Sequence, residues 1–531
     1  MKKFLGPLGL LAAALVVAAC GSSSQTVPVG TSTTPGSLAL NPPFRIASAD
    51  AATFAAQVGA TDSGKQLLQL TGAPTCGVDF YYLKFWTVGG ANEATQSSGA
   101  LMVPTGGSGC SGPRPIVLYA HGTNTNQALN IADVTDPTNS EGALIAAMFA
   151  AQGYIVVAPN YAGYDISTLG YHPFLDAAQQ SGEMMDILKA ARTALPKTFA
   201  AATTDNGKLF ITGYSEGGHV AMATQRAMQA AGATVTAAAP MSGPYALEAF
   251  GDAIFFGSVN LGSTVFGPLL TTSYQHAYGN IYAAPTDIYS STYAAGIDTL
   301  LPNVTPLDTL FIDGKLPQTA LFNSTTPTVS IPGQAGLSAA LTAALAVPIV
   351  DPNNPVTALF AAGFGSPYLL NNSFRVAYAV DAATDPDGAV PTPSAGVPLA
   401  AAPPTQTFRL ALYTNDLRNG NWAPASPTLL CGGDLDPTVF FSVNTEIMAA
   451  FWGALPAGLV TVLDVNGAPA GPFAAIQTAF VDSQGALLAF YMSAAGGGLT
   501  LAQAEQQLVQ GYHGAVAPFC ALAARSFFAN F

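Results

Sequence analysis

The stretch KLFITGYSEGGHV, residues 208–220, decides how the chain folds. Residues 208–212 form an apolar run of strand length, and residues 217–231 carry an Ala- and Met-rich helical pattern. Between them Ser215 stands in a G-x-S-x-G motif, which recurs by chance in Gly-rich chains but is typical of a nucleophile elbow when a strand precedes it and a helix follows. In such a turn the serine takes strained backbone angles, and the flanking glycines remove collisions. The sequence therefore predicts Ser215 as a nucleophile.

The alternation of strand and helix extends to both sides of Ser215. Apolar runs such as PIVLYA (115–120) and YIVVA (154–158) are typical of strands buried on both faces. The alternation stops near residue 245 and strand patterns return at residue 428. Repeated β-α-β units predict an α/β fold, with a mostly parallel sheet, helices on both faces and a large, mainly helical cap inserted at residues 245–422. The strands are expected at 80–87, 99–104, 115–120, 154–158, 208–212, 234–240, 428–431 and 459–465, and the helices at 141–152, 173–195 and 217–231.

A serine nucleophile needs a base, and the chain has five histidines. In this architecture the chain order is serine, acid and then histidine, which lies on the loop after the final strand. His513, in the sequence GYHG, is the histidine that fits this order, against the alternative of an isolated surface histidine. The remaining histidines fit other places in the predicted fold; they are His121, His172, His219 and His276.

The acid is expected on the loop after the strand that precedes the final one. PTLLCGGDLDPTVFF, residues 427–441, occupies that place and offers Asp434 and Asp436. Asp436 lies five residues beyond Cys431 and is favoured, and Asp434 is interpreted as a turn-forming residue. The acid would hold the imidazole in one tautomer and stabilise its charged form.

An oxyanion hole requires two backbone N–H donors. The first is expected from the residue after the nucleophile, Glu216. The second is expected from the turn after the strand 115–120, where Thr123 is the first choice and Gly122 the second.

Composition excludes several classes of protein. Of the 531 residues 50% are apolar and only 9% are charged, which is far from a disordered composition. The net charge of −14, without a Lys- and Arg-rich block, argues against a nucleic-acid partner. A metal site is not expected either, because neither C-x-x-C nor H-x-x-x-H spacing occurs.

The N-terminus carries the pattern of an export signal. Lys2 and Lys3 precede an apolar stretch, residues 4–17, that is too short to span a membrane. The stretch ends in VAAC, which resembles the lipobox of bacterial lipoproteins and predicts lipidation at Cys20; an ordinary signal peptide is the alternative. Residues 1–20 are thus interpreted as a lipoprotein signal and residues 21–43 as a flexible Ser/Thr/Pro/Gly tether. We expect an exported bacterial lipoprotein, anchored at the outer membrane or cell surface.

Four further cysteines favour disulfides in an exported chain. They allow three pairings, and sequence proximity favours Cys76 with Cys110, which leaves Cys431 with Cys520.

Taken together, these motifs resemble the α/β-hydrolase superfamily and, within it, the secretory lipase group of capped bacterial and fungal lipases. The resemblance rests on LYAHGT, YIVVAPNYAGY, ITGYSEGGH, PTLLCGGDLDPTV and YHGAVAPF. It implies carboxylic-ester hydrolysis through an acyl-enzyme, with Ser215, Asp436 and His513 as the triad and no cofactor. The spacing of 77 residues between Asp436 and His513 is longer than is usual in the family.

Three functions remain open from the sequence. The first is a hydrolase of lipid or other small hydrophobic esters, the second a capped α/β serine peptidase, and the third a catalytically inactive, tethered binding lipoprotein. A peptidase cap would often be a propeller with repeats of about 40–50 residues, and residues 245–422 contain none. The catalytic domain is predicted at residues 44–244 and 423–531.

Overall fold

A computed structural model describes residues 33–136, 138–387, 403–420 and 422–531. The described chain divides into two compact units. We call residues 33–241, 424–431 and 517–531 the sheet unit, and residues 242–423 and 432–516 the helical unit. The predicted signal peptide, lipidation at Cys20 and first part of the tether lie outside the described residues.

The central sheet has nine strands in the order β1-β2-β3-β5-β4-β6-β7-β10-β11. The first three pair antiparallel, and β3 joins them to a parallel set made by β5, β4, β6, β7 and β10. The prediction of a mostly parallel α/β sheet is therefore confirmed. The strands are β1 (Phe44–Ala49), β2 (Gly77–Val88), β3 (Ala94–Thr105), β4 (Gly112–Ala120), β5 (Ile155–Pro159), β6 (Thr203–Tyr214), β7 (Ala237–Met241), β10 (Thr428–Gly432) and β11 (Val460–Asp464).

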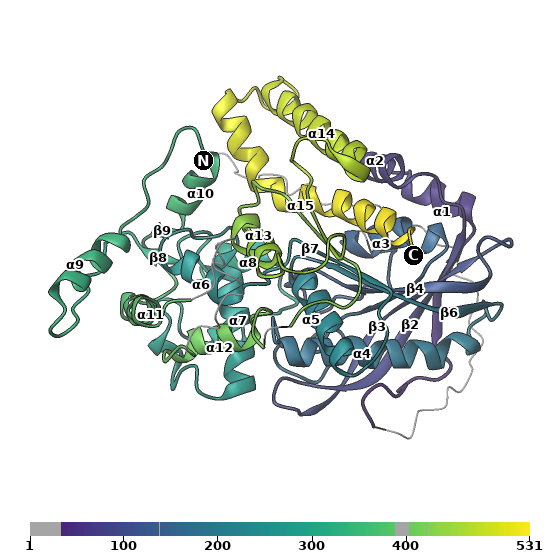
Figure 1. The fold of residues 1–531 in the computed structure, drawn as a ribbon, viewed down its shortest axis with the longest axis horizontal. Coiled ribbons are helices and arrows are strands. Elements are labelled where there is room, and N and C mark those ends of the chain that lie inside the picture. Colours follow the sequence, from purple (N-terminus) through teal and green to yellow (C-terminus); the bar gives the residue numbers. More distant parts are fainter. Residues whose placement is uncertain (1–32, 137, 388–402, 421) are drawn as a thin grey trace. The chain divides into compact units, whose positions relative to one another are not determined.

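Helices cover both faces of the sheet within the sheet unit (Figure 1). Leu209 and Ile211 of β6 belong to a buried cluster that includes Met184 on one face. Phe210, between them, points to the other face, where its ring stacks on Phe528 with 4.5 Å between centroids. This alternation follows from the period of two along a strand. The helices of the unit are α1 (Ala51–Val58), α2 (Asp62–Thr71), α3 (Ser140–Met148), α4 (Ala177–Ala194), α5 (Glu216–Ala230) and the end of α15 (Leu501–Phe528).

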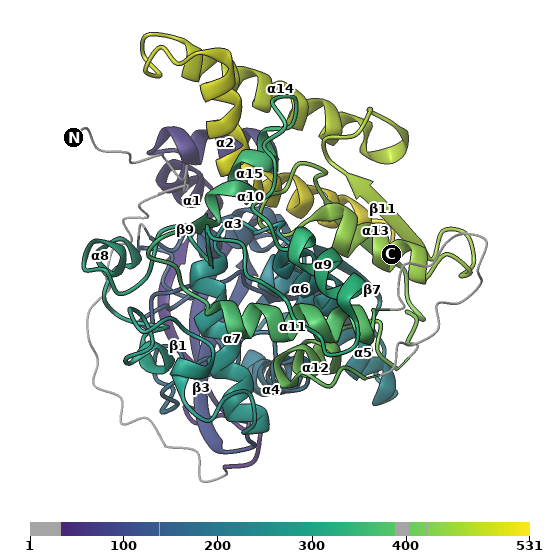
Figure 2. The same cartoon turned by 90° about the vertical axis from the view of Figure 1, so that its left-hand side faces the viewer.

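The helical unit has its own aromatic core among four helices. Their ribbons run close together in Figure 2, and they are α6 (Leu247–Phe255), α7 (Ser263–Tyr278), α11 (Asn372–Thr384) and α12 (Thr407–Asn415). Phe255 stacks on Tyr378 with 3.8 Å between ring centroids and contacts Phe374 and Phe408. The remaining elements of the unit are α8 (Leu307–Ile312), β8 (Phe322–Asn323), α9 (Ala335–Ala344), α10 (Pro355–Ala362), β9 (Phe364–Gly365), α13 (Phe441–Phe451), α14 (Ala474–Met492) and most of α15. The predicted cap, residues 245–422, falls inside this unit, which also takes in residues 432–516.

Several boundaries differ from those expected, and two of the differences have a clear local cause. The helix predicted from residue 173 begins at Ala177, because Asp176 caps its N-terminus and Leu175, with φ of 55°, cannot be helical. The tether predicted for residues 21–43 ends earlier than expected, because the Gly36 N–H donates to the Trp86 carbonyl oxygen and Leu38 is buried.

In the described part of the chain, no helix combines the length and apolar character needed to cross a membrane.

Candidate active site

Ser215 occupies a sharp turn between β6, which ends at Tyr214, and α5, which begins at Glu216. Its backbone angles, φ 59° and ψ −121°, lie in a region that non-glycine residues rarely adopt. The turn is fixed by the Ser215 N–H, which donates to Met241 O of β7 at 3.0 Å. The structure thus places the predicted nucleophile in a strained strand-to-helix turn, as the motif predicted.

The two glycines of the motif are required because β4 passes directly against the turn. A Cβ atom on Gly213 would lie 2.3 Å from Gly217 O and 2.5 Å from Ala120 O. A Cβ atom on Gly217 would lie 2.0 Å from the same Ala120 oxygen. No side chain fits at such distances, so only glycine permits this turn.

The loop after β4 runs past the same turn. A Cβ atom on Gly122 would lie 3.3 Å from Tyr214 O and 3.7 Å from Ser215 Cβ. The Gly122 N–H donates to the Glu141 carboxylate at 3.0 Å, so this donor is already engaged. The N–H of Thr123 forms no hydrogen bond within the described residues. Of the two donors considered from the sequence, Thr123 is therefore the one whose N–H is not already engaged by the described residues.

Two buried carboxyl groups flank these backbone donors. Burial raises the pKa of Glu141, whose Oε1 accepts a hydrogen bond from Tyr119 OH at 2.7 Å. Burial also acts to raise the pKa of Glu216, but the neighbouring His172 and His121 outweigh it and bring that pKa below its ordinary value. The Glu216 side chain is therefore a buried carboxylate, while its backbone N–H is the predicted oxyanion donor.

Asp436 and His513 form a hydrogen-bonded pair in the helical unit. His513 Nδ1 lies 2.6 Å from Asp436 Oδ2. The other carboxylate oxygen, Oδ1, accepts the N–H groups of Thr438 and Val439 at 2.9 and 3.0 Å. Asp436 is only 3% exposed, so the carboxylate is held on both sides in one orientation. A carboxylate in this position fixes the tautomer and direction of an imidazole ring.

Asp434, the alternative acid, is exposed. Its Oδ1 accepts a hydrogen bond from Asn466 at 2.8 Å, and its N–H donates to Asp464 Oδ1 at 3.2 Å. Asp434 lies in the turn that the Asp436 N–H closes on Gly433 O at 3.2 Å, as the sequence suggested, and its own contacts reach the end of β11.

The sequence predicted His513 on a loop, and this prediction is wrong: His513 lies within α15. The flanking Gly511 and Gly514 look like helix breakers, yet one side of this helix is buried and outweighs their low propensity. Tyr512 and Val516, at helical spacing, are 1% and 0% exposed.

Both disulfides have the pairing that proximity favoured. Cys76 is bonded to Cys110, next to β2 and the loop after β3. Cys431, at the end of β10, is bonded to Cys520 of α15. The second bond lies five residues from Asp436 along one segment and seven from His513 along the other. It therefore ties together the two segments that carry the acid and the histidine.

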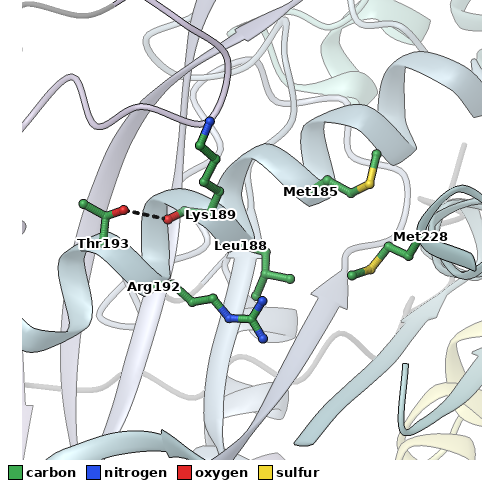
Figure 3. A pocket seen from close by; sticks show the side chains of 6 residues that line it. All are labelled: Met185, Leu188, Lys189, Arg192, Thr193 and Met228. Atoms are coloured by element: carbon green, nitrogen blue, oxygen red, sulfur yellow. Dashed lines mark hydrogen bonds between the residues drawn. The ribbon is translucent and has the colours of Figure 1, made fainter. Parts of the chain in front are cut away.

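A cavity of about 400 Å³ lies elsewhere on the sheet unit, between α4 and α5 (Figure 3). Met228, which lines it, is 13 residues along the chain from Ser215, or about 20 Å along a helix. The remaining lining residues are Met185, Leu188, Lys189, Arg192 and Thr193. The cavity is thus remote from the elbow. Among the described residues no group of three or more His, Cys, Asp or Glu side chains is arranged to hold a metal ion.

Comparison with known proteins agrees with this geometry. The model of the prolyl oligopeptidase family matches residues 142–255. Curated proteins offer no match to the chain. The structure of the rice cell wall degrading esterase LipA from Xanthomonas oryzae is 26% identical with a TM-score of 0.59, covering 81% of this chain and 91% of that one. A ligand-bound form of the same esterase is 25% identical, with the same TM-score of 0.59 and the same coverage of 81% and 91%.

A protein of Legionella pneumophila, 18% identical, reaches a TM-score of 0.56 over 80% of this chain and 90% of that one, which is a likeness of fold. The strand order, the elbow at Ser215 and these neighbours together show that the chain is an α/β-hydrolase that resembles esterases of the same fold.

Proposed function

We propose that the chain is a serine carboxylic ester hydrolase that cleaves small or lipid-like hydrophobic acyl esters through an acyl-enzyme. The observation that carries the proposal is the strained elbow at Ser215, a strand-to-helix turn that costs about 1–3 kcal/mol and leaves the serine half-buried at the start of α5. The Asp436–His513 pair and the likeness to an esterase of 26% identity support it.

In the proposed reaction, Ser215 Oγ attacks the ester carbonyl carbon and His513 accepts the hydroxyl proton. The backbone N–H groups of Glu216 and Thr123 stabilise the negative charge on the carbonyl oxygen. His513 then protonates the leaving alcohol. A water molecule that His513 deprotonates attacks the acyl carbon, and His513 gives that proton to Ser215 Oγ as the acid leaves. Asp436 holds the His513 ring and stabilises its charged form. No step needs a metal or a cofactor.

A serine peptidase is the second candidate, because the prolyl oligopeptidase family model matches residues 142–255, which include the elbow. The catalytic steps would be the same, and the bond cleaved would be an amide. Fold alone does not separate the two reactions.

One experiment separates the two functions and tests Ser215. Purified protein is assayed on p-nitrophenyl esters from acetate to palmitate and, in parallel, on aminopeptidase and prolyl-peptide substrates. Each acyl methylene that is buried contributes about 0.8 kcal/mol, so kcat/KM should rise about fourfold per methylene until the acyl site is full. Ser215→Ala should lower kcat by several orders of magnitude, and a fluorophosphonate probe should label Ser215.

Peptide cleavage with a flat dependence on acyl length would replace the ester hydrolase by the peptidase. Full activity in Ser215→Ala, with labelling of another serine, would reject both candidates. Absence of any Ser215-dependent hydrolysis would favour the tethered binding protein.

We also propose that the mature protein is anchored to a membrane through a lipid on Cys20. The lipobox-like VAAC supports this location, and the two disulfides suit an exported protein. Cys20→Ser should move the protein from the membrane fraction to the soluble fraction of expressing cells. An unchanged distribution would leave ordinary secretion as the better description.

A further inference from the structure

A buried histidine–carboxylate pair next to the elbow has no part in the proposed reaction steps. His172 lies in the loop between β5 and α4, and its Nε2 is 2.7 Å from Glu216 Oε1. Its Nδ1 is 2.9 Å from Ala162 O. Neither side chain has exposed surface. A carboxylate and a carbonyl oxygen only accept hydrogen bonds, so a His172 ring that donates from both nitrogens satisfies both partners.

Two neighbouring side chains hold the carboxylate of Glu216. Besides His172, the Gln180 Nε2 donates to the same Oε1 at 2.7 Å. Burial alone would favour a neutral carboxyl group, but the positive neighbours keep the pKa of Glu216 low. A charged residue thus forms the first position of α5, directly after the nucleophile, and its charge is balanced inside the protein.

The same cluster reaches the loop that carries the second oxyanion donor. The Tyr161 ring lies 5.5 Å from the ring of His172 and 4.1 Å from that of His121. Tyr161 OH donates to His121 O at 3.0 Å. His121 begins the loop that contains Thr123. The two segments that supply the proposed donors therefore contact one continuous group of buried rings.

Other buried carboxyl groups lie near the pair of His172 and Glu216. Glu183 of α4 accepts hydrogen bonds from Ala162 N at 2.9 Å and Gln179 Nε2 at 3.0 Å. Burial raises the pKa of Glu183, as it does for Glu141. Of these three buried carboxyl groups, Glu216 is the one that an imidazole contacts directly.

We propose that His172 is a positioning residue of the hydrolase: its ion pair with Glu216 fixes the first residue of α5, so that the Glu216 N–H meets the developing oxyanion. This inference rests on the proposed function. A backbone donor stabilises a transition state only if it is already held where the charge will form. Without its partner, a buried Glu216 carboxylate would be driven to move or to become neutral, and the backbone of the first helical turn would move with it.

The test compares His172→Gln, Glu216→Gln and the double variant, with Glu183→Gln as a matched control. Glu183 is equally buried in the same cluster but does not contact Glu216. His172→Gln should lower kcat on the preferred ester roughly ten- to a hundredfold, less than the loss of a whole donor, with KM changed less than about twofold. Binding of a phenylboronic acid, which forms a tetrahedral oxyanion mimic on Ser215, should weaken by the same factor. The double variant should lose no more than the worse single variant, whereas Glu183→Gln should keep its kcat.

Equal kcat values in folded His172→Gln, Glu183→Gln and wild-type protein would overturn the inference. If His172→Gln does not fold, Glu216→Gln supplies the same comparison. Nitrogen NMR of the wild-type protein at about pH 7 gives a readout independent of activity: both ring nitrogens of His172 should carry protons, and a neutral ring would refute the ion pair. If wild-type ester hydrolysis depends on Ser215 and the kcat of His172→Gln is unchanged, the positioning role is rejected and the proposed function stands.

Discussion

Two aspartates that lie two residues apart, Asp434 and Asp436, have different surroundings. Asp436 is buried, accepts two backbone N–H groups and faces His513 Nδ1 at 2.6 Å. Asp434 is exposed, and its side chain accepts a hydrogen bond from Asn466. Of the two, Asp436 is the one placed to orient an imidazole ring.

We therefore expect Asp436→Asn to lower kcat by about 10³- to 10⁴-fold, because an amide at this position favours the wrong tautomer of His513. Asp434→Asn keeps the turn and should change kcat less than about threefold. Steady-state kinetics of the two variants on one ester, with circular dichroism to confirm folding, make the comparison. Similar small losses in both would place the acid elsewhere.

Residues that a local motif or the chain order marks could be predicted, and a contact that neither of these marks could not. Ser215 and its glycines form one turn, so their spacing was informative. His172 and Glu216 are 44 residues apart and meet only in the folded sheet unit. The weak signal for His172 was its place directly before the predicted helix at residues 173–195.

At the scale of elements, strand prediction succeeded because parallel strands are short, apolar runs. The structure extends several of them by a few residues; β6, predicted at 208–212, spans Thr203–Tyr214. Prediction failed for α15, because the chain order of the architecture placed His513 on a loop, and the flanking Gly511 and Gly514 are poor helix formers. Burial of one helix face overrides those local preferences, and no local pattern reports it.

Helix α6 carries an acid with an unusual environment. Glu248 is 1% exposed, and its Oε1 lies 2.9 Å from Arg409 Nη2. Burial, together with the nearby Asp387, Asp252 and Asp416, raises the pKa of Glu248 to about 8, against the opposing effect of Arg409.

Because the folded-state pKa of Glu248 lies above its unfolded value of 4.5, the native state binds more protons between about pH 4.5 and pH 8. The contribution of Glu248 to stability is therefore complete below about pH 4.5 and is lost as the pH rises to about 8. Glu248→Gln should lack this loss, so between pH 5 and pH 9 the stability of wild type should fall relative to the variant, by about 1–2 kcal/mol after relaxation of its neighbours. Urea unfolding at several pH values measures the difference, with the exposed Glu505→Gln as control. Parallel pH profiles of wild type and Glu248→Gln would contradict the shifted pKa.

At the scale of the whole molecule, the Cys431–Cys520 bond spans 89 residues of chain, and the Cys76–Cys110 bond spans 34. Chain entropy assigns each about 4 kcal/mol. Of the two bonds, only Cys431–Cys520 joins the segments that lead to Asp436 and His513.

We therefore expect the double variants Cys431→Ser/Cys520→Ser and Cys76→Ser/Cys110→Ser to lose comparable stability by thermal unfolding. At a temperature where both are folded, the first should have a lower kcat and the second a nearly unchanged one. Equal kcat values in both pairs would show that the acid and histidine need no such fastening.

The bond from β10 to α15 has a further consequence for the cell that makes this enzyme. Cytoplasmic thiols are kept reduced. A newly synthesised chain that is still in the cytoplasm therefore lacks the Cys431–Cys520 disulfide, which joins the segments that carry Asp436 and His513. Under the proposed export, we expect the acid and histidine segments to be fastened together only after the chain reaches an oxidising compartment. Formation of the Cys431–Cys520 bond would then limit full activity to the oxidising compartment outside the cytoplasm.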